Sequence, residues 1–338
     1  MTIFKSFVEK VQSWVSTGHE KSPQEFEALA MELFYFQAEA NPVYRQYLSA
    51  RKIDPASIQS IQNIPYLPIG FFKSHAVISG READFSKFYA SSGTTGVITS
   101  RHYIWNEAFY LQHSKRLFEQ QYGALSDFHI LALLPAYLER KDSSLVAMAD
   151  FFIQESQSPI SGFYLYEQKE LIEKLIAIRD DSRKVLLLGV TFALLDLSES
   201  GFALPKMSNL TVMETGGMKG RRKEMIREEV HERLKVFFQV EAIHSEYGMT
   251  ELLSQAYSKG DGKYTMPPSM QVSLREINDP FSPSHRSQGG INLIDLANFH
   301  SCAFLETQDL GRVDDKGFLE VLGRIDNSEI RGCNLMVN

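Results

Sequence analysis

The chain has 338 residues, of which 43% are hydrophobic, so it is long enough to bury the core of one large domain or of two unequal ones. Its formal net charge of −7 provides no global basic field, which argues against a nucleic-acid-binding protein. Two cysteines form no disulfide framework, no apolar signal segment is evident, and no run approaches the roughly 20 apolar residues of a membrane span, so we expect a cytoplasmic protein.

Helices are expected over the first 50 residues. A capping box with proline at the first helical position is expected at 22–25, where the sequence reads Ser-Pro-Gln-Glu. Two prolines make 64–69 an extended connector, because proline lacks a backbone donor and restricts the residue before it. The apolar face of the first helix is predicted from residues at helical spacing: Phe4, Phe7, Val8, Val11 and Val15.

A loop of hydroxyl residues and glycines follows the connector. Glycines allow a tight turn and close approach to a ligand, and the hydroxyls and backbone N–H groups can surround an anionic phosphate chain. The loop is not a P-loop, because no Gly-Lys-Ser/Thr sequence closes it. The same composition is also typical of a flexible surface turn. The loop consists of Ser91, Ser92, Gly93, Thr94, Thr95 and Gly96.

An α/β pattern begins near residue 127. Buried strands are predicted at 128–134, 185–190 and 210–213, a helix at 219–235 and a further strand at 240–243. This alternation predicts a mainly parallel sheet with flanking helices and right-handed crossovers. Ligands bind beyond the carboxyl ends of such strands. Two candidate site segments lie there: Gly216 with Gly217, and residues 246–251.

A small β-subdomain is predicted after about residue 289. Short strands there alternate with turns, and Asp314-Asp315-Lys316-Gly317 is a hairpin signal. The expected fold class is therefore α/β, with a helical part at 1–80, an α/β core at 81–288 and a β-rich part at 289–338.

Two further segments carry residues suited to binding a nucleotide. Tyr247 can stack on a planar base, and Thr250 and Glu251 can reach phosphate and Mg²⁺. Asp309 can accept both hydroxyls of a ribose, and Arg324 can hold phosphate in a bidentate fork. Each feature also has a structural interpretation: a strand end with a buried tyrosine and a solvated glutamate, a turn aspartate, and a surface ion pair.

The order of these motifs resembles the adenylate-forming superfamily of acyl- and aryl-CoA synthetases, peptide-synthetase adenylation domains and luciferases. Within it, the chain is most similar to the LuxE-type acyl-protein synthetases. That narrower resemblance rests on residues 36–37, 41–44, 64–69 and 72–73 and on the ending near 331–335. It implies the fold of an adenylate-forming N-terminal domain without the large C-terminal lid of CoA ligases.

The resemblance implies a role for each candidate residue. Ser91 to Gly96 would hold the β- and γ-phosphates of ATP, and the acyl pocket would be bordered by 189–191. Gly216 and Gly217 would line the adenine site, and Tyr247, between Glu246 and Gly248, would stack on the base. Thr250 would contact the α-phosphate, and Glu251 would bind Mg²⁺. Asp309 would bind the ribose, and Arg324 would lie at the hinge position.

The implied reaction has two steps. A fatty acid carboxylate attacks the α-phosphate of ATP and gives acyl-adenylate and pyrophosphate. A cysteine of the enzyme then takes the acyl group and passes it to a partner protein such as an acyl reductase. Cys333 lies in the matching region, although it could equally be an inert residue, and Cys302 is expected to pack in the core.

Two departures from the superfamily pattern leave alternatives open. Ile98 and Thr99 stand where many members have Pro-Lys, so either Arg101 takes over the phosphate contact or ATP use is weaker. The lid that carries a catalytic lysine in CoA ligases is expected to be missing. The alternatives are a phenylacetate-CoA-ligase-like enzyme with CoA as acceptor, and a non-catalytic subunit that binds a nucleotide or an acyl chain.

Overall fold

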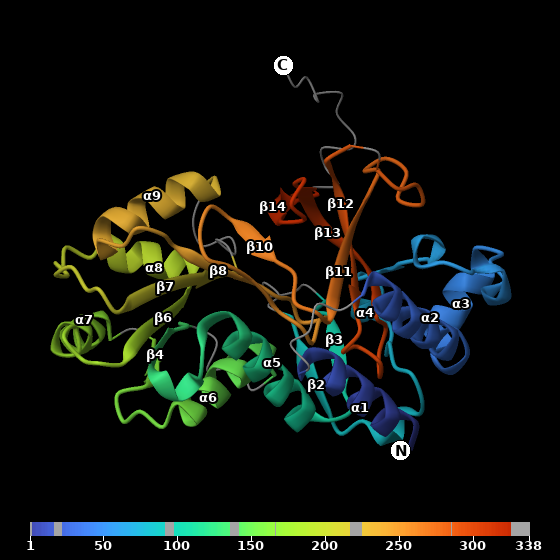
Figure 1. Cartoon of the computed structure of the whole chain (residues 1–338), viewed down its shortest axis with the longest axis horizontal. Helices are drawn as coiled ribbons and strands as arrows, with labels where there is room; N and C mark the ends of the chain where they lie inside the picture. The colour runs from blue at the N-terminus through green and yellow to red at the C-terminus, as the bar shows by residue number, and fades with distance from the viewer. Residues whose placement is uncertain are drawn as a thin grey trace. The chain divides into compact units, whose positions relative to one another are not determined.

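The chain divides into two compact units. Unit 1 comprises Met1–Phe85 and Pro268–Asn338, and unit 2 comprises Ser86–Pro267. The computed structural model in Figure 1 describes residues 2–16, 22–91, 98–135, 142–165, 167–216, 225–284 and 286–325. The three-part domain division drawn from the sequence stays a prediction.

The helices of unit 1 follow the expected pattern. They are α1 (Thr2–Ser16), α2 (Pro23–Ala40), α3 (Pro42–Ala50) and the short α4 (Phe71–Ser74). Ser22 and Glu25 form the predicted capping box, which satisfies backbone donors that the first turn leaves open. Of the predicted apolar face of α1, Val8 is half-buried and the others are buried: Phe4, Phe7, Val11 and Val15.

The strands of unit 1 are mainly antiparallel. β11 (Met270–Arg275), β12 (Gln288–Asp295), β13 (Phe304–Val313) and β14 (Leu319–Arg324) lie in that order, and β1 (Leu67–Pro68) pairs with β13 in parallel. The extended connector at 64–69 is therefore confirmed. So is the hairpin signal at 314–317, which joins β13 to β14.

Residues that carry the narrower resemblance hold α2 against the chain that leads into β13. The Gln37 amide donates to the Asn298 carbonyl at 2.8 Å and accepts from the Ala303 N–H at 2.9 Å. Asn41 donates to the Ser301 carbonyl at 3.0 Å. Both side chains are buried, where a polar group is costly unless it is hydrogen-bonded. These residues thus have a structural role in unit 1.

Unit 2 contains a mixed sheet. The strand order is β10-β9-β8-β7-β6-β4-β5. Neighbouring strands run parallel from β8 to β5, whereas β9 is antiparallel to both β8 and β10. Helices α8 and α9 lie on one side of these strands and α5 and α6 on the other (Figure 1). The strands are β4 (Phe128–Leu133), β5 (Gly162–Tyr164), β6 (Lys184–Val190), β7 (Leu210–Thr215), β8 (His244–Tyr247), β9 (Ala256–Ser258) and β10 (Lys263–Thr265).

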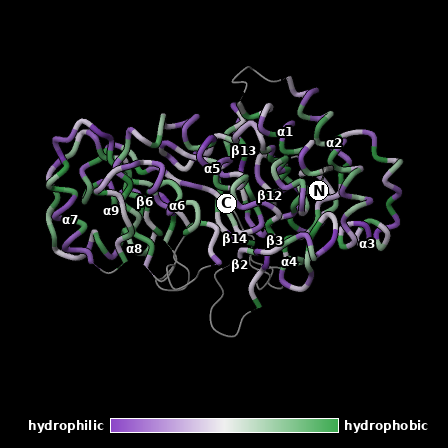
Figure 2. Tube along the Cα trace, turned by 90° about the horizontal axis from the view of Figure 1, so that it is seen from below, coloured by the Kyte–Doolittle hydropathy of each residue, from purple (hydrophilic) through white to green (hydrophobic). Residues whose placement is uncertain are grey.

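The helices of unit 2 cover its apolar strands. They are α5 (Glu107–Tyr122), α6 (Ser144–Ser156), α7 (Gln168–Ala177), α8 (Thr191–Ser198) and α9 (Arg227–Phe238). Hydrophobic and hydrophilic residues alternate along the helical traces, as expected for helices with one buried face (Figure 2). None of the described helices combines the length and apolar character needed to cross a membrane.

The three buried strands predicted for this unit are confirmed as β4, β6 and β7. The helix predicted from residue 219 is wrong at its start, because 225–226 are not helical and α9 begins at Arg227. The strand predicted at 240–243 is also misplaced. Residue Gln239 adopts a left-handed conformation that ends α9, Ile243 is buried in the connection, and β8 begins at His244, opposite Met213 of β7.

Strands β9, β10 and β11 were not expected from the sequence. They lie between residues 256 and 275, and two of them are only three residues long. A three-residue strand has no periodicity that could distinguish it from a loop. The α/β class is confirmed, with a larger antiparallel share than predicted.

Candidate functional site

The hydroxyl-and-glycine loop connects two paired strands. β2 (Lys87–Ala90) and β3 (Arg101–Ile104) are antiparallel, and Ser91 closes the connection between them. The Ser91 N–H donates to the Ser100 carbonyl at 3.0 Å, and the Ser91 hydroxyl accepts from the Ser100 N–H at 2.9 Å. Ser92, Gly93, Thr94, Thr95 and Gly96 lie outside the described residues.

Two of the candidate segments meet at the carboxyl ends of neighbouring strands. Thr215, the last residue of β7, lies opposite Glu246 of β8, and its hydroxyl donates to the Glu246 carboxylate. Gly216 follows directly with φ 81°, a left-handed conformation that favours glycine. Gly217 is outside the described part of the chain. The parallel sheet thus brings Gly216 and the 246–251 segment together, as predicted from the sequence.

Gly248 is required by the carboxylate beside it. A Cβ atom at this position would lie 2.4 Å from Glu246 Oε1, so any larger residue would displace that side chain. Tyr247 is buried, and its ring centroid is 5.7 Å from that of Tyr264. The backbone at Gly248 is therefore packed closely against the buried Glu246 carboxylate, and the Tyr247 ring packs against Tyr264.

Thr250 and Glu251 follow in a turn that is held from β3. The His102 ring donates from Nδ1 to the Thr250 carbonyl at 2.8 Å, which identifies the proton-bearing nitrogen because a carbonyl can only accept. His102 is fully buried and Glu251 is buried at 5% exposure. A solvated glutamate, the structural alternative for Glu251, is therefore wrong.

A buried acid near the end of β7 connects this strand with the starts of α8 and α9. The Thr191 hydroxyl donates to Glu214 Oε2 at 2.7 Å, while His231 Nε2 and Arg227 Nε lie 3.7 and 4.0 Å from Glu214 Oε1. Burial raises the pKa of Glu214, but His231, Arg227, Ser245 and Thr191 together outweigh burial and hold that pKa below its ordinary value. Glu214 is therefore a buried carboxylate that stays charged.

The segment predicted to border an acyl pocket is tightly packed. A Cβ at Gly189 would lie 2.7 Å from Leu194 Cγ, so α8 lies directly against the end of β6. Val190 and Thr191 are buried. Gly189 is thus needed for close packing between this strand and the helix that follows it.

Unit 1 presents Asp309 and Arg324 on neighbouring strands. They are opposite each other in the β13–β14 pair, with Arg324 Nε 3.8 Å from Asp309 Oδ1. Arg324 is 78% exposed, whereas Asp309 is only 14% exposed. The Asp309 N–H donates to the Thr307 hydroxyl at 3.1 Å. Asp309 and Arg324 therefore form an ion pair, which was the structural alternative to a nucleotide-binding role for Arg324.

A buried guanidinium supports β13 next to Asp309. Arg275 donates to the carbonyls of Ile291 at 2.7 Å and Thr307 at 2.6 Å, and to Asn292 Oδ1 at 3.0 Å. Burial lowers the pKa of Arg275, against the opposing effect of the Glu306 and Asp309 carboxylates. Arg275 thus fixes the position of the Thr-x-Asp segment.

Cys302 and Arg101 lie outside these clusters and have different environments. Cys302 is buried as predicted, and burial raises the pKa of its thiol to about 12, so it is a poor nucleophile. Arg101 is exposed, with its guanidinium carbon 5.2 Å from the centre of the Phe88 ring. Cys333 lies outside the described residues.

The donor set for a metal ion is small. Across the described ranges, no three His, Cys, Asp or Glu residues come close enough to hold a metal ion together. Mg²⁺ is usually held by one or two carboxylates together with substrate phosphates, so the buried carboxylate of Glu251 fits such a site.

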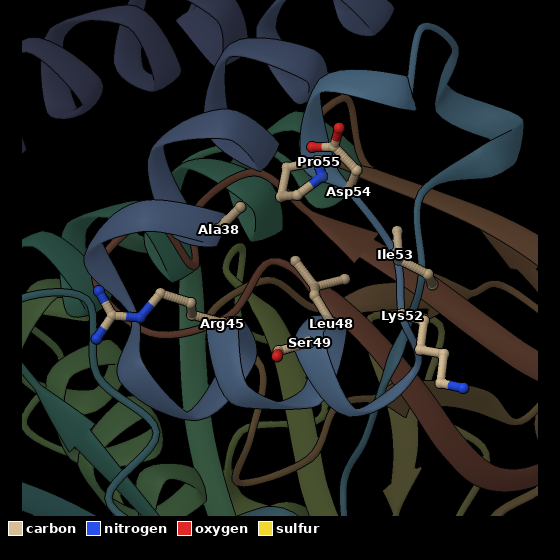
Figure 3. A pocket seen from close by; sticks show the side chains of 8 residues that line it. All are labelled: Ala38, Arg45, Leu48, Ser49, Lys52, Ile53, Asp54 and Pro55. Atoms are coloured by element: carbon tan, nitrogen blue, oxygen red, sulfur yellow. The ribbon is translucent and has the colours of Figure 1, made fainter.

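A surface hollow in unit 1 contains none of the predicted site residues (Figure 3). It lies along α2, α3 and the following turn, and the Arg45 and Lys52 side chains extend outward at its edges. Its lining residues are Ala38, Arg45, Leu48, Ser49, Lys52, Ile53, Asp54 and Pro55.

The most important site contacts were missed from the sequence. His102, Glu214, Arg227 and Tyr264 had no role in the sequence interpretation. The partner of His102 is 148 residues away along the chain, and no local pattern indicates such a contact. None of the four had a contiguous signal: Glu214 follows the apolar run at 210–213, but a charged residue at the end of such a run is ordinary.

The comparisons with known proteins support the fold and the resemblance. A model of the family described as "Acyl-protein synthetase, LuxE" matches residues 13–104. A long-chain-fatty-acid–luciferin-component ligase of Aliivibrio fischeri is 31% identical over 91 residues, which cover 27% of this chain and 23% of that ligase. The match thus spans less than a quarter of the curated relative.

The solved structures that are similar to this chain include a CoA ligase. A 2-hydroxyisobutyryl-CoA ligase in complex with 2-HIB-AMP and CoA has a TM-score of 0.69 at 12% identity, over 93% of this chain and 70% of that one. ATP-bound MatB from Rhodopseudomonas palustris has a TM-score of 0.54 at 16% identity, over 87% and 61% of the two chains. The chain therefore has the adenylate-forming fold of these two proteins, and its resemblance to the LuxE acyl-protein synthetases is confirmed over residues 13–104.

Proposed function

We propose that this protein activates a fatty acid with ATP as an acyl-adenylate and transfers the acyl group to a thiol. The supporting observation is the convergence of Gly216, Tyr247, Thr250 and Glu251 at the carboxyl ends of β7 and β8. A base, a phosphate chain and a carboxylate can be bound at such an edge. The fatty acid oxygen attacks the α-phosphorus, the bond to the bridging oxygen breaks, and pyrophosphate leaves.

The chain's own residues would bind and orient the reactants. Tyr247 stacks on the base, Thr250 contacts the α-phosphate, and Arg101 contributes positive charge. Mg²⁺ at Glu251 would neutralise charge on the phosphates during the displacement. The remaining nucleotide contacts are proposed for Ser91, Ser92, Gly93, Thr94, Thr95, Gly96, Gly216, Gly217, Glu246, Gly248, Asp309 and Arg324.

The proposed acyl acceptor within the chain is Cys333. The thiolate attacks the acyl carbon of the adenylate, AMP leaves, and a thioester forms. Cys302 is unsuited to this step, because it is buried and its pKa is raised to about 12. An acyl-accepting partner protein would then receive the acyl group.

The first test is ATP–pyrophosphate exchange with a panel of fatty acids. Glu251→Gln removes the charge proposed to hold the metal and is expected to lower exchange about 100-fold. Glu173→Gln, on the exposed surface of α7, is the matched control and should leave exchange unchanged. Exchange that is equally fast in Glu251→Gln would contradict the metal-binding role, and no exchange with any acid would contradict activation itself.

The second test follows the acyl group by intact mass spectrometry. Wild type and Cys302→Ala are expected to gain one hydroxylamine-labile acyl group, and Cys333→Ser is expected to gain none. If all three remain unmodified while AMP is released, water has taken the acyl group from the adenylate, and the acceptor role of Cys333 is overturned. Acyl-CoA formation on adding CoA would then favour the CoA-ligase alternative.

A further inference from the structure

A line of contacts connects a buried acid to the ring proposed to stack on the base. It starts at Glu214, whose Oε1 lies 4.0 Å from Arg227 Nε. The Arg227 guanidinium carbon is 5.5 Å from the centre of the Tyr264 ring, within the range of a cation–π interaction. The Tyr264 ring is in turn 5.7 Å from Tyr247, tilted at 56°. All four side chains belong to unit 2.

The backbone of unit 2 makes room for the Arg227 side chain. Gly262, in the turn between β9 and β10, has φ +64°, and a Cβ there would lie 2.9 Å from Arg227 Cδ and Nη1. The guanidinium side chain is 26% exposed and therefore largely desolvated. A charge in such a place interacts more strongly with a ring than it would in water.

Arg227 also connects the start of α9 with the end of β7. Glu214 precedes Gly216 by two residues, and Arg227 is the first residue of α9, where the helix begins. His231, one turn later on α9, lies 3.7 Å from the same Glu214 oxygen. Two side chains of α9, those of Arg227 and His231, thus lie beside the one buried carboxylate of β7.

We propose that Arg227 is a positioning residue that sets the affinity for the nucleotide base, by supporting the Tyr264 ring against Tyr247 and by tying the start of α9 to Glu214. This inference rests on the proposed function, in which Tyr247 stacks on the base. Arg227 acts through its neighbours on the base alone. Contacts with the phosphates and with the acid are therefore independent of it.

The test measures equilibrium binding without turnover, using ATP and inorganic tripolyphosphate as two probes. Arg227→Met keeps the length of the side chain and removes its charge, and it is expected to weaken ATP binding about fivefold to tenfold. Tripolyphosphate, which lacks a base, should bind as it does to wild type. Arg227→Lys keeps a cation over the ring and should recover part of the affinity for ATP.

The matched control is Arg233→Met, on an exposed part of α9 where Arg233 pairs with Glu199 and Glu229. It should bind both probes like wild type. If Arg227→Met does not fold, Tyr264 carries the test: Tyr264→Leu should weaken ATP binding selectively, and Tyr264→Phe should not.

Two outcomes overturn the inference while the proposed function stands. One is unchanged ATP affinity in Arg227→Met, and the other is an equal loss of affinity for ATP and tripolyphosphate, which indicates a general structural defect. A wild-type protein that binds no ATP would overturn the proposed function itself, so the two failures are distinguishable.

Discussion

The two units hold their buried charges in different ways. In unit 2, the Glu214 carboxylate is surrounded by side chains from α8 and α9, namely Thr191, Arg227 and His231. In unit 1, the Arg275 guanidinium donates mainly to backbone carbonyls of the strands beside it. Both arrangements satisfy a buried charge, which would otherwise be very costly.

This difference indicates how each unit can change. Backbone acceptors are part of the sheet and cannot move without breaking it, so β13 and Asp309 have a fixed position. Side-chain partners can be exchanged or repositioned by single substitutions. Substitutions among the partners of Glu214 in unit 2 should therefore change the affinity for the nucleotide. Substitutions of Arg275 in unit 1 should mainly lower the free energy of unfolding.

The largest effect is expected at Arg275. Arg275→Met leaves the carbonyl of Thr307 and the amide of Asn292 without this donor, and we expect a loss of about 3 kcal/mol in the free energy of unfolding. Urea unfolding measures it. Arg312→Met, which removes an exposed pair with Glu320, should change stability by less than about 0.5 kcal/mol. If both substitutions lower the free energy of unfolding equally, the buried hydrogen bonds of Arg275 stabilise the protein no more than an exposed ion pair does.

Gly248 tests the close packing at the candidate site of unit 2. In Gly248→Ala, the new methyl group must displace Glu246, whose carboxylate accepts from Thr215, so we expect a loss of about 1–3 kcal/mol and reduced nucleotide binding. Gly162→Ala is the control, because nothing lies within 4 Å of its Cβ position. Wild-type stability in Gly248→Ala would show that Glu246 moves freely.

Acid should weaken unit 2 through a buried histidine. Burial, with a smaller effect of Arg116, lowers the pKa of His113 from 6.5 to about 3. The unfolded chain therefore binds a proton below pH 6.5 that the folded protein excludes until about pH 3, so stability falls as the pH falls through this window.

This contribution amounts to up to about 1.4 kcal/mol per pH unit. His113→Gln should make the free energy of unfolding less dependent on pH between 6.5 and 4, as measured by urea unfolding at several pH values. His75→Gln, at an exposed position, is the control. An unchanged slope in His113→Gln would mean that other groups cause the acid sensitivity.

The smallest effect is expected at the end of α3 in unit 1. Lys52 has φ 57°, and its N–H donates to the Ser49 carbonyl; it follows the C-cap residue Arg51, at the position where glycine is usual. Lys52→Gly should relieve the strain and stabilise the protein by about 0.5 kcal/mol. Lys52→Ala should give no gain, and a comparable gain from alanine would exclude backbone strain as the cause.

Local patterns predicted the helices of the first 50 residues and the three long buried strands, whereas α5, α6 and α7 were not predicted and the start of α9 was wrong. The capping box at Ser22 and the apolar runs of β4, β6 and β7 depend on neighbours in sequence, so they are visible without the fold. The start of β8 was displaced by four residues, because pairing with β7 rather than local hydrophobicity selects the residues that enter the sheet. The short strands of unit 2 were missed for the same reason.

The candidate site was predictable in its motifs and not in its supporting contacts. The glycine at 216 and the Tyr-Gly-x-Thr-Glu segment are contiguous signals, and topology places both at strand ends. Glu214 and Arg227 have no such signal as partners, since a charged residue at either position is ordinary on a protein surface. Their burial and proximity come from the way α9 packs on the sheet.

The sequence by itself determined the α/β class, the main strands and the order of the candidate motifs, because these follow from the period of apolar residues and from contiguous residue types. Only the tertiary structure decided which charged residues are buried and which partners they have. Those contacts join residues far apart in sequence, such as His102 with Thr250 and Gln37 with Asn298. Desolvation and hydrogen bonding act between neighbours in space, and no local pattern along the chain carries that information.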